Sequence, residues 1–276
     1  MISGMLLLWD ILTAASLVFV LWDLFTNTPA VWVMKLAWAL VILYTGPVGL
    51  FIYLLSCRQP LPGTHDQFIA AHWKQAVGSM MHCVAGDATG IILAAALVYR
   101  FGLPNGVDLT LEYLSAFVVG LLVFQALFML SMYPSYAAAV RGTFFAETVS
   151  MNMVMIGMLP TMVLLMGRLP ASRDPTGPLF WGVMSLATLA GMATAYPINS
   201  WMVRRGLKHG MMTAPPPGGT SAGEMAHGGH SMVHHSMAPH HGATLPFAQA
   251  GAVVLLTFAA LGGVVLLTSA FVPIRF

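Results

Sequence analysis

One apolar segment, residues 144–166, is long enough to cross a bilayer and contains one carboxylate and six methionines. Because an α-helix turns by about 100° per residue, the carboxylate and four of the methionines share one helix face: Glu147, Met151, Met155, Met158 and Met162. Thioether sulfur is a soft ligand that suits Cu(I), whereas hard cations prefer oxygen. The ordinary alternative is that these flexible side chains only fill gaps between helices. The spacing therefore indicates either a sulfur-lined copper path with Glu147 at its entrance or a methionine-rich packing face.

A second helix face combines three kinds of ligand. In residues 76–98, Met80, Cys83 and Asp87 follow one another at i, i+3 and i+7, which projects a thioether, a thiol and a carboxylate from the same side. An ionisable side chain in a membrane span costs about 2.5 to 3.5 kcal/mol on insertion scales and usually faces a bundle interior or a wet cavity. Asp87 is therefore the strongest single candidate for function. The alternative is a hydrogen-bonded carboxyl group that joins two helices.

His82 is a further candidate metal ligand, but it points about 100° away from Cys83 on the helix. It shares a strip with Gly78 and Gly86, and small residues at this spacing allow a neighbouring helix to approach closely. His82 could ligate a metal, donate to a backbone carbonyl or relay a proton, or it could be an ordinary buried histidine. Neighbouring residues diverge on a helix, so the sequence alone does not place His82 and Cys83 in one coordination sphere.

A histidine- and methionine-rich stretch precedes the last apolar run. Residues 213–223 form a Pro/Gly-rich spacer, and residues 224–241 contain six of the ten histidines of the chain. Such a composition lacks the apolar content to fold alone, so we expect a flexible, disordered loop over residues 213–246. Imidazole binds zinc and copper, and the methionines favour copper because thioether is a poor zinc ligand. The expected metal-collecting residues are His227, His230, Met232, His234, His235, Met237, His240 and His241.

These side chains need a membrane-embedded scaffold, and the composition predicts one. The chain has 276 residues, 58% of them hydrophobic and 7% charged, with a mean hydropathy of +0.81. An ordinary soluble domain is excluded by these values. Runs close to the roughly 20 residues that a spanning helix needs fall at residues 5–25, 31–56, 76–98, 112–133, 144–166, 179–202 and 247–271. We predict an all-α integral membrane protein, a bundle of about seven transmembrane helices.

The predicted organisation has four parts. Two helices and a connecting loop occupy residues 1–69, a core four-helix unit residues 70–212, the His/Met-rich loop residues 213–246, and a last helix residues 247–276. The first run lacks a basic start and a small-residue cleavage site, so we expect a retained helix and not a signal peptide. Cys57 and Cys83 fall at different membrane depths, which favours free thiols.

The eleven Lys and Arg residues indicate an orientation. With the N-terminus in the cytoplasm and the C-terminus outside, most basic residues of the connections face the cytoplasm. This orientation places the His/Met-rich loop in the cytoplasm and the chain in the bacterial inner (cytoplasmic) membrane. A net charge of +2 without a basic stripe excludes a nucleic-acid partner from the working hypotheses.

Polar and helix-breaking residues accompany these faces. The supporting polar residues expected near the path are Gln125, Asn152, Tyr196, Asn199 and His209. Gly157 and Pro160 are expected to interrupt the fifth apolar run, and Pro197 the sixth. Transporters use broken helices at binding sites, although proline also bends helices that bind nothing.

Three strings carry a resemblance: HCVAGDATGI at residues 82–91, AETVSMNMVMIGMLPTM at 146–162 and YPINSWMVRRGLKHGM at 196–211. They resemble the core of a family of uncharacterised bacterial multi-pass membrane proteins, a domain of unknown function, over about residues 70–212. The resemblance implies that the third, fifth and sixth helices form the shared unit. It implies no activity.

The chemistry of these residues predicts a copper-handling membrane protein, most simply a transporter or permease for Cu(I). The bilayer and the metal ion are its expected partners, and a metallochaperone is a candidate donor. The sequence lacks a GxxxxGK[ST] motif, so we expect facilitated or proton-coupled transport. The alternative is a membrane redox enzyme or assembly factor in which His82 and another histidine hold haem or copper, with zinc as a further metal.

Overall fold

The computed structural model describes residues 2–214 and 245–275. The predicted metal-collecting residues lie outside this range: His227, His230, Met232, His234, His235, Met237, His240 and His241. The described residues form helices and no strand, and seven of the helices are long and apolar enough to cross a membrane. The predicted all-α membrane fold with seven such helices is therefore confirmed.

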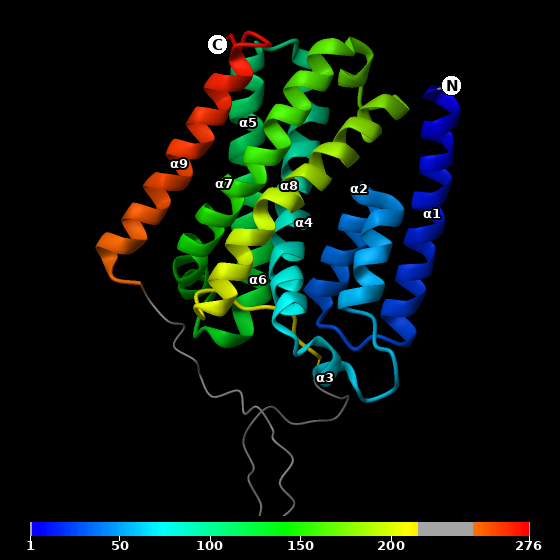
Figure 1. Ribbon diagram of the computed structural model, residues 1–276, viewed down its shortest axis with the longest axis vertical. Coiled ribbons are helices and arrows are strands. Elements are labelled where there is room, and N and C mark those ends of the chain that lie inside the picture. Colours follow the sequence, from blue (N-terminus) through cyan, green and yellow to red (C-terminus); the bar gives the residue numbers. More distant parts are fainter. Residues whose placement is uncertain (1, 215–244, 276) are drawn as a thin grey trace, which may run out of the picture.

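Six long helical runs pass from one end of the molecule to the other (Figure 1). They are α1 (Ile2–Thr26), α4 (His72–Val98), α5 (Asn105–Val118) continued by η2 (Val119–Gln125) and α6 (Ala126–Met129), α7 (Tyr136–Arg168), α8 (Pro178–Arg204) and α9 (Phe247–Ser269). The shorter elements are α3 (His65–Ile69), η1 (Tyr99–Phe101), η3 (Leu130–Met132) and η4 (Pro170–Arg173). The remaining long helix, α2 (Trp32–Ser56), takes a different course.

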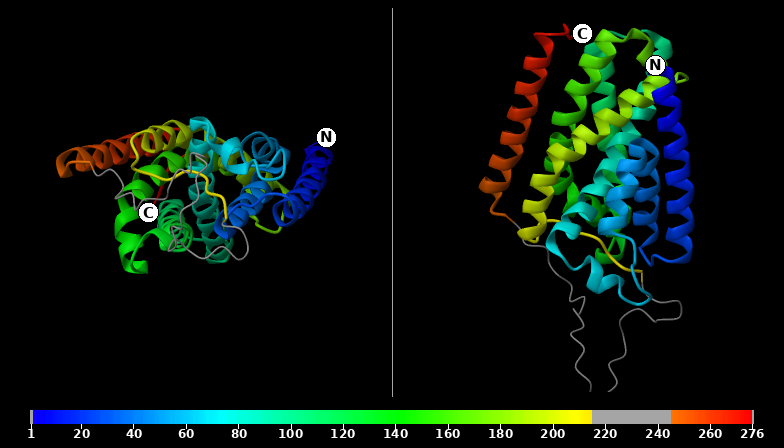
Figure 2. Two further views of the ribbon diagram at one scale, coloured as in Figure 1. Left: turned by 90° about the horizontal axis from the view of Figure 1, so that it is seen from below. Right: turned by 45° about the vertical axis from the view of Figure 1, so that its right-hand side comes forward.

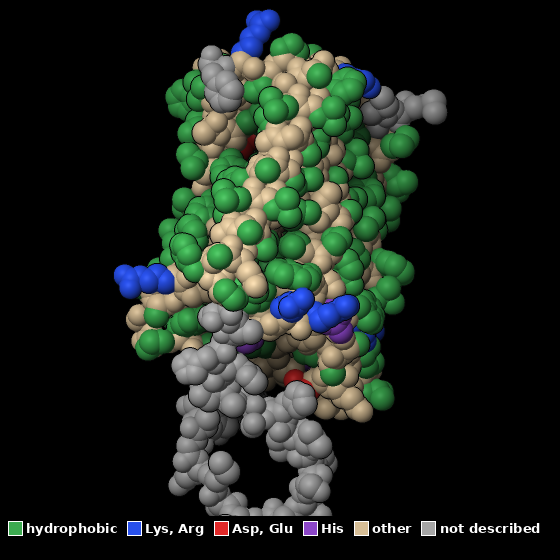
Figure 3. Space-filling model, turned by 60° about the vertical axis from the view of Figure 1, so that its left-hand side comes forward, with side chains coloured by type: hydrophobic (Ala, Val, Ile, Leu, Met, Phe, Trp, Pro, Cys, Tyr) green, Lys and Arg blue, Asp and Glu red, His purple; other side chains and the backbone are tan. Residues whose placement is uncertain are grey.

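The helices form a flattened bundle with α1 and α9 at its two flanks and α4, α7 and α8 near its centre (Figure 2). Residues 57–71 and 205–214 lie at one end, which we name the loop end (Figure 1). We name the opposite end, where both chain termini lie, the terminal end. On the face drawn in Figure 3, hydrophobic side chains predominate in the middle and Lys and Arg lie nearer the two ends, as expected for a protein surrounded by lipid.

Helix α2 is a hairpin and does not cross the bundle. Its helical backbone is interrupted at Gly46, with φ 57° and ψ −135°, directly before Pro47. The ring centroids of Trp38 and Tyr53 lie only 5.3 Å apart, whereas fifteen residues of straight helix would separate them by about 22 Å. Both ends of α2 therefore lie at the loop end, and the turn lies at mid-depth (Figure 1).

The polar backbone at this turn is satisfied by side chains from other helices. The carbonyl of Tyr44 accepts a hydrogen bond from Ser185 Oγ of α8 at 2.5 Å, and the Tyr44 hydroxyl lies 2.8 Å from Thr89 Oγ1 of α4. Trp9 of α1 in turn donates to Ser185. Irregular backbone at membrane depth is tolerated only where protein or water meets its hydrogen bonds, and here protein does.

The hairpin brings both termini to one end of the bundle. Trp9 contacts α8 near its start, and Gly106 at the start of α5 donates its backbone N–H to the Arg275 carbonyl at 2.7 Å. An N-terminus on the cytoplasmic side and a C-terminus outside therefore do not fit this fold. The reason is that the second apolar run returns to the side from which it started.

The residues expected to interrupt the fifth and sixth apolar runs do not end the helices. Helix α7 runs through Gly157 and Pro160, and α8 runs through Pro197. The irregular segment in the core is instead η2, a stretch of π-helix. There Gly86 and Gly120 lie so close that a Cβ on Gly86 would stand 2.7 Å from the Gly120 Cα. Small residues thus permit close contact of α4 with η2, as the strip containing Gly86 predicted.

A fully paired carboxylate holds the base of the α2 hairpin against α1. Asp23 is buried, and its Oδ1 accepts from Arg58 Nε at 2.9 Å and from Asn27 at 3.2 Å. Its Oδ2 accepts from the Tyr53 hydroxyl at 2.5 Å and from Thr28 at 2.9 Å. The donors come from α2 and from the loops that follow α1 and α2, so Asp23 joins these segments to α1.

Candidate functional site

Cys83 lies at the centre of a buried polar cluster between α4, α7 and the chain that follows α8. Its thiol donates to Glu147 Oε2 at 3.1 Å and accepts from Lys208 Nζ at 2.7 Å. His82 Nδ1 lies 3.6 Å and Gln125 Oε1 3.8 Å from the same sulfur. Adjacent residues on a helix diverge, yet the His82 ring turns back far enough to meet the sulfur.

Lys208 reaches the cluster from a segment that folds back beneath the bundle. After α8 the chain turns at Gly206, where φ is +67°, and residues 205–214, which we name the closing segment, run under α4. A Cβ on Gly78 would lie 2.8 Å from Met211 Cβ, so a larger residue at position 78 would push this segment away. Lys208 is consequently only 5% exposed.

Two further contacts hold the end of the closing segment. Thr213 pairs with Ala30 in an isolated β-bridge, and its hydroxyl lies 2.7 Å from His65 Nδ1. His65 Nε2 lies 3.0 Å from the Cys57 carbonyl. Burial lowers the pKa of His65, with the Cys57 carbonyl and Asp66 opposing the shift, so the ring is neutral near pH 7.

A buried amide and two hydroxyl groups position the Lys208 ammonium. Asn199 Oδ1 accepts from Lys208 Nζ at 2.7 Å, and Asn199 Nδ2 donates to Ser150 Oγ at 2.9 Å. Ser79 donates to the same Asn199 oxygen at 3.4 Å. The ammonium is therefore held by an acceptor on α8 as well as by the sulfur on α4.

The carboxylates of Asp87 and Glu147 face each other across Gly120. A Cβ on Gly120 would collide with an oxygen of both, which shows how closely they meet over the bare backbone of η2. Both residues are fully buried, and no described residue donates a hydrogen bond to either Asp87 oxygen or to Glu147 Oε1. Two ionised carboxylates repel each other strongly in such surroundings, so this arrangement calls for a shared proton or a cation between them.

The methionine stripe of α7 starts one turn above Glu147 and points into the protein. Met151, Met155, Met158 and Met162 are all at most 2% exposed. Met158 packs over Gly191 of α8, where a Cβ would lie 2.7 Å from the Met158 Cγ. The stripe thus faces the bundle interior and not the lipid, as both sequence hypotheses require.

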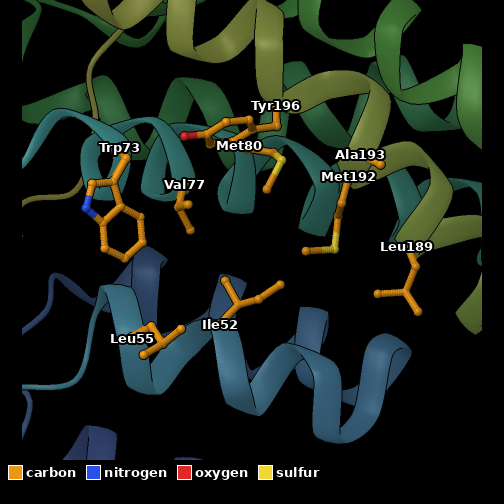
Figure 4. Close-up of a pocket in the computed structure, with 9 residues that line it drawn as sticks. All are labelled: Ile52, Leu55, Trp73, Val77, Met80, Leu189, Met192, Ala193 and Tyr196. Atoms are coloured by element: carbon orange, nitrogen blue, oxygen red, sulfur yellow. The ribbon is translucent and has the colours of Figure 1, made fainter.

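Several of the predicted residues lie outside the Cys83 cluster. Met80 and Tyr196 line an apolar groove of about 400 Å³ between α2, α4 and α8, where the Met80 and Met192 side chains point toward the gap (Figure 4). Asn152 accepts from the Tyr113 hydroxyl at 2.9 Å and donates to Thr257 at 3.1 Å, which ties α5, α7 and α9 together.

The structure unites two helix faces that the sequence kept apart. Cys83 and Asp87 of α4 meet Glu147 of α7, with Gln125, His82 and Asn199 at the edge of the group. The backbone of His209, next to Lys208, lies against His82. Both cysteines are buried free thiols, as predicted.

Lys208, Ser150 and Gly120 were not among the predicted site residues. Lys208 was counted as a cytoplasmic charge because it follows the sixth apolar run. Its position inside the third family-like string, YPINSWMVRRGLKHGM, was the available signal. No sequence pattern distinguishes Gly120 from other helix glycines.

The cluster is not a preformed metal centre. Among the described residues, no three or more His, Cys, Asp or Glu side chains are arranged to hold a metal ion. The position next to the sulfur is occupied by the Lys208 ammonium. What the cluster provides is a chain of proton-bearing groups from Lys208 through Cys83 to Glu147, and Asp87 beyond it.

Residues 72–208 match the family model described as Domain of unknown function (DUF4396). The predicted resemblance to an uncharacterised family over about residues 70–212 is confirmed. No curated protein and no solved structure matches the chain.

Proposed function

We propose that this protein transports a soft monovalent cation, Cu(I), through a membrane site centred on Cys83. The observation that carries the proposal is the buried contact of one thiol with a lysine ammonium at 2.7 Å and a carboxylate at 3.1 Å. Burying a lone ionised group costs several kcal/mol. A positive charge next to a thiol and two carboxylates supports a cation-handling role.

In this proposal, Lys208 is a resident cation that the transported ion replaces. A thiol binds Cu(I) as thiolate, so the sulfur–hydrogen bond is exchanged for a sulfur–copper bond and one proton is released. Glu147 accepts that proton because the thiol already donates to it, and the Asp87 carboxyl lies next along the chain. The Lys208 ammonium moves away as the metal charge arrives, which keeps the net charge of the site unchanged.

The methionine stripe then provides the next sulfur ligands. Met151 and Met155 follow Glu147 at one-turn intervals on α7, all facing inward. Thioethers bind Cu(I) without a proton and without charge, so a row of them allows the ion to pass between neighbouring sites. The His/Met-rich residues 224–241 continue the chain from the closing segment and would deliver or accept the ion.

We further propose that the loop end faces the cytoplasm. Seven of the eleven basic residues belong to this end: Lys35, Arg58, Lys74, Arg141, Arg204, Arg205 and Lys208. The positive-inside rule then assigns both termini to the opposite side of the membrane. The predicted cytoplasmic placement of the His/Met-rich residues is kept, whereas that of the N-terminus is not.

The test is Cu(I) uptake into proteoliposomes by the wild-type chain, by Cys83→Ser and by Cys57→Ser as the matched control. Both cysteines are buried, and burial raises the pKa of the Cys57 thiol, which makes it an inert comparison. Cys83→Ser should reduce uptake at least tenfold, and Cys57→Ser should leave it unchanged. Equal uptake by the wild type and Cys83→Ser would exclude this site.

Deleting residues 224–241 tests whether the membrane site or the His/Met-rich stretch carries the transport activity. We expect weaker but measurable uptake, because the membrane site stands on rigid helices. Complete loss of uptake with normal membrane insertion would show that the membrane site alone does not carry the activity. The alternative, a haem or copper redox enzyme using His82, remains a prediction that the visible absorption spectrum of the purified protein tests, because haem is coloured and bound Cu(I) is not.

A further inference from the structure

A second polar cavity lies at the terminal end of the bundle, far from Cys83. It has a volume of about 220 Å³ and is enclosed by α4, the start of α5, the end of α7 and the start of α8. Its wall includes the carboxylates Asp108 and Glu112 and the thioethers Met162 and Met166. No predicted feature of the sequence other than Met162 pointed to it.

One oxygen of each carboxylate in this cavity is buried without a hydrogen-bond partner among the described residues. Glu112 is 3% exposed, and no described donor reaches its Oε2 or the Asp108 Oδ1. Arg173 also lines the cavity and attracts Asp108 electrostatically. Within the described parts of the chain, however, the one ion pair closer than 4.0 Å is that of Arg58 with Asp23. A buried carboxylate oxygen without a donor leaves room for a ligand that supplies positive charge.

The cavity stands at the far end of the methionine stripe. Met162 is its last predicted member, and Met166 follows one turn later. From Glu147 to Met166 the helix rises by about 28 Å, close to the roughly 30 Å of a bilayer core. One row of sulfur therefore connects the Asp87 and Glu147 carboxylates with those at the terminal end.

We propose that Glu112, Met162 and Met166 form a second binding site for a soft monovalent cation. Two thioethers and one carboxylate suit Cu(I), whereas a hard cation would want more oxygen ligands than these residues offer. Asp108 adds negative charge at the mouth, and Arg173 stands where it can withdraw or return as the ion arrives. The proposal rests on the proposed function, since it assigns the other end of the same path.

The test is a Cu(I) titration of the full-length protein in detergent against a competing chromophoric chelator. The variants are Glu112→Gln, Met162→Leu, Cys83→Ser and the double variant Glu112→Gln/Cys83→Ser. Met153→Leu, a methionine of α7 outside the stripe, is the matched control. These changes nearly conserve volume, and thermal unfolding of each preparation verifies the fold.

Glu112→Gln and Met162→Leu should each bind one equivalent less than the wild type, the double variant two less, and Met153→Leu as much as the wild type. Wild-type stoichiometry in both Glu112→Gln and Met162→Leu would overturn the second site. So would loss of the Glu112-dependent equivalent in excess Na⁺, because the site would then prefer a hard cation. If Cys83→Ser alone retains full stoichiometry, the proposed function fails while the second site stands.

Discussion

Two buried carboxylate sites, Asp23 near the end of α1 and Asp87 in the middle of α4, differ in how their oxygens are used. At the Asp23 site, both oxygens accept hydrogen bonds from four neighbouring residues, one of them the Arg58 guanidinium. At the Asp87 site, neither oxygen accepts one from a described residue, and a second carboxylate, Glu147, faces it across Gly120. In the first arrangement, neighbouring residues balance the negative charge. In the second, the proposed function assigns this balance to a proton or a cation that binds and dissociates.

Under the proposed function, this difference distinguishes a structural carboxylate, Asp23, from a functional one, Asp87. A paired charge that joins three segments contributes to stability and has little left with which to bind anything. An unpaired buried carboxylate lowers stability and persists in proteins where its titration or ligation is used. Substituting the two residues in the same way should therefore give opposite outcomes.

The largest effect is expected for Asp23→Asn. The amide cannot accept all four hydrogen bonds and leaves Arg58 without its counter-ion. Breaking a buried pair costs about 3–5 kcal/mol, and since the Arg58 side chain is 41% exposed we expect the lower part of that range or less, about 2–3 kcal/mol. Thermal unfolding in detergent measures the loss. Uptake per folded molecule should remain unchanged, and a selective loss of uptake would place Asp23 in the functional machinery.

Asp87→Asn should behave in the reverse manner. The amide is nearly isosteric and removes a charge that is costly to bury, so unfolding should shift by less than about 1 kcal/mol. Uptake should fall at least tenfold, equivalent to about 1.4 kcal/mol, because an amide neither takes a proton nor balances a cation. Wild-type uptake at every pH would identify Asp87 as a helix-joining residue and remove the contrast with Asp23.

The smallest effect is expected from His65, which holds the closing segment over the Cys83 cluster. Burial lowers its pKa below the usual value of about 6.5. Its contribution to stability is therefore present above about pH 6.5 and is lost as the pH falls toward the lowered pKa, since the unfolded chain takes up the proton first. Limited proteolysis of residues 205–214 should accelerate between pH 7.5 and pH 5.5. In His65→Gln the acceleration should be weaker, and an identical pH response would assign it to another group.

The sequence predicted the helices better than their directions. Hydropathy locates a long apolar run because burial in lipid depends on side chains, so the spans containing Cys83 and Glu147 were found. It does not register that the chain reverses at Gly46, since both halves of the α2 hairpin are equally apolar. A Gly–Pro pair in such a run is as compatible with a kink in a continuous helix as with a reversal of the chain.

The candidate site was predicted in halves. Helical periodicity groups residues of one helix, so Cys83 with Asp87 and Glu147 with the methionines emerged separately. Which faces meet depends on contacts such as Gly86 against Gly120, which are set by packing between helices. Lys208 was missed because a basic residue after a span is ordinarily a surface charge, and here the closing segment carries it inward.

Because the chain reverses at Gly46, the described helices cross the membrane an even number of times and not an odd number. Of the seven long apolar helices, α2 folds back and six run from end to end, so the chain begins and finishes on one side. Reporter proteins fused to the N-terminus and to the C-terminus should give the same compartment signal, whatever that compartment is. A pair of opposite signals would require an odd number of crossings. Pore-forming, substrate-binding or affinity modules attached at either end would likewise work on the same face of the membrane.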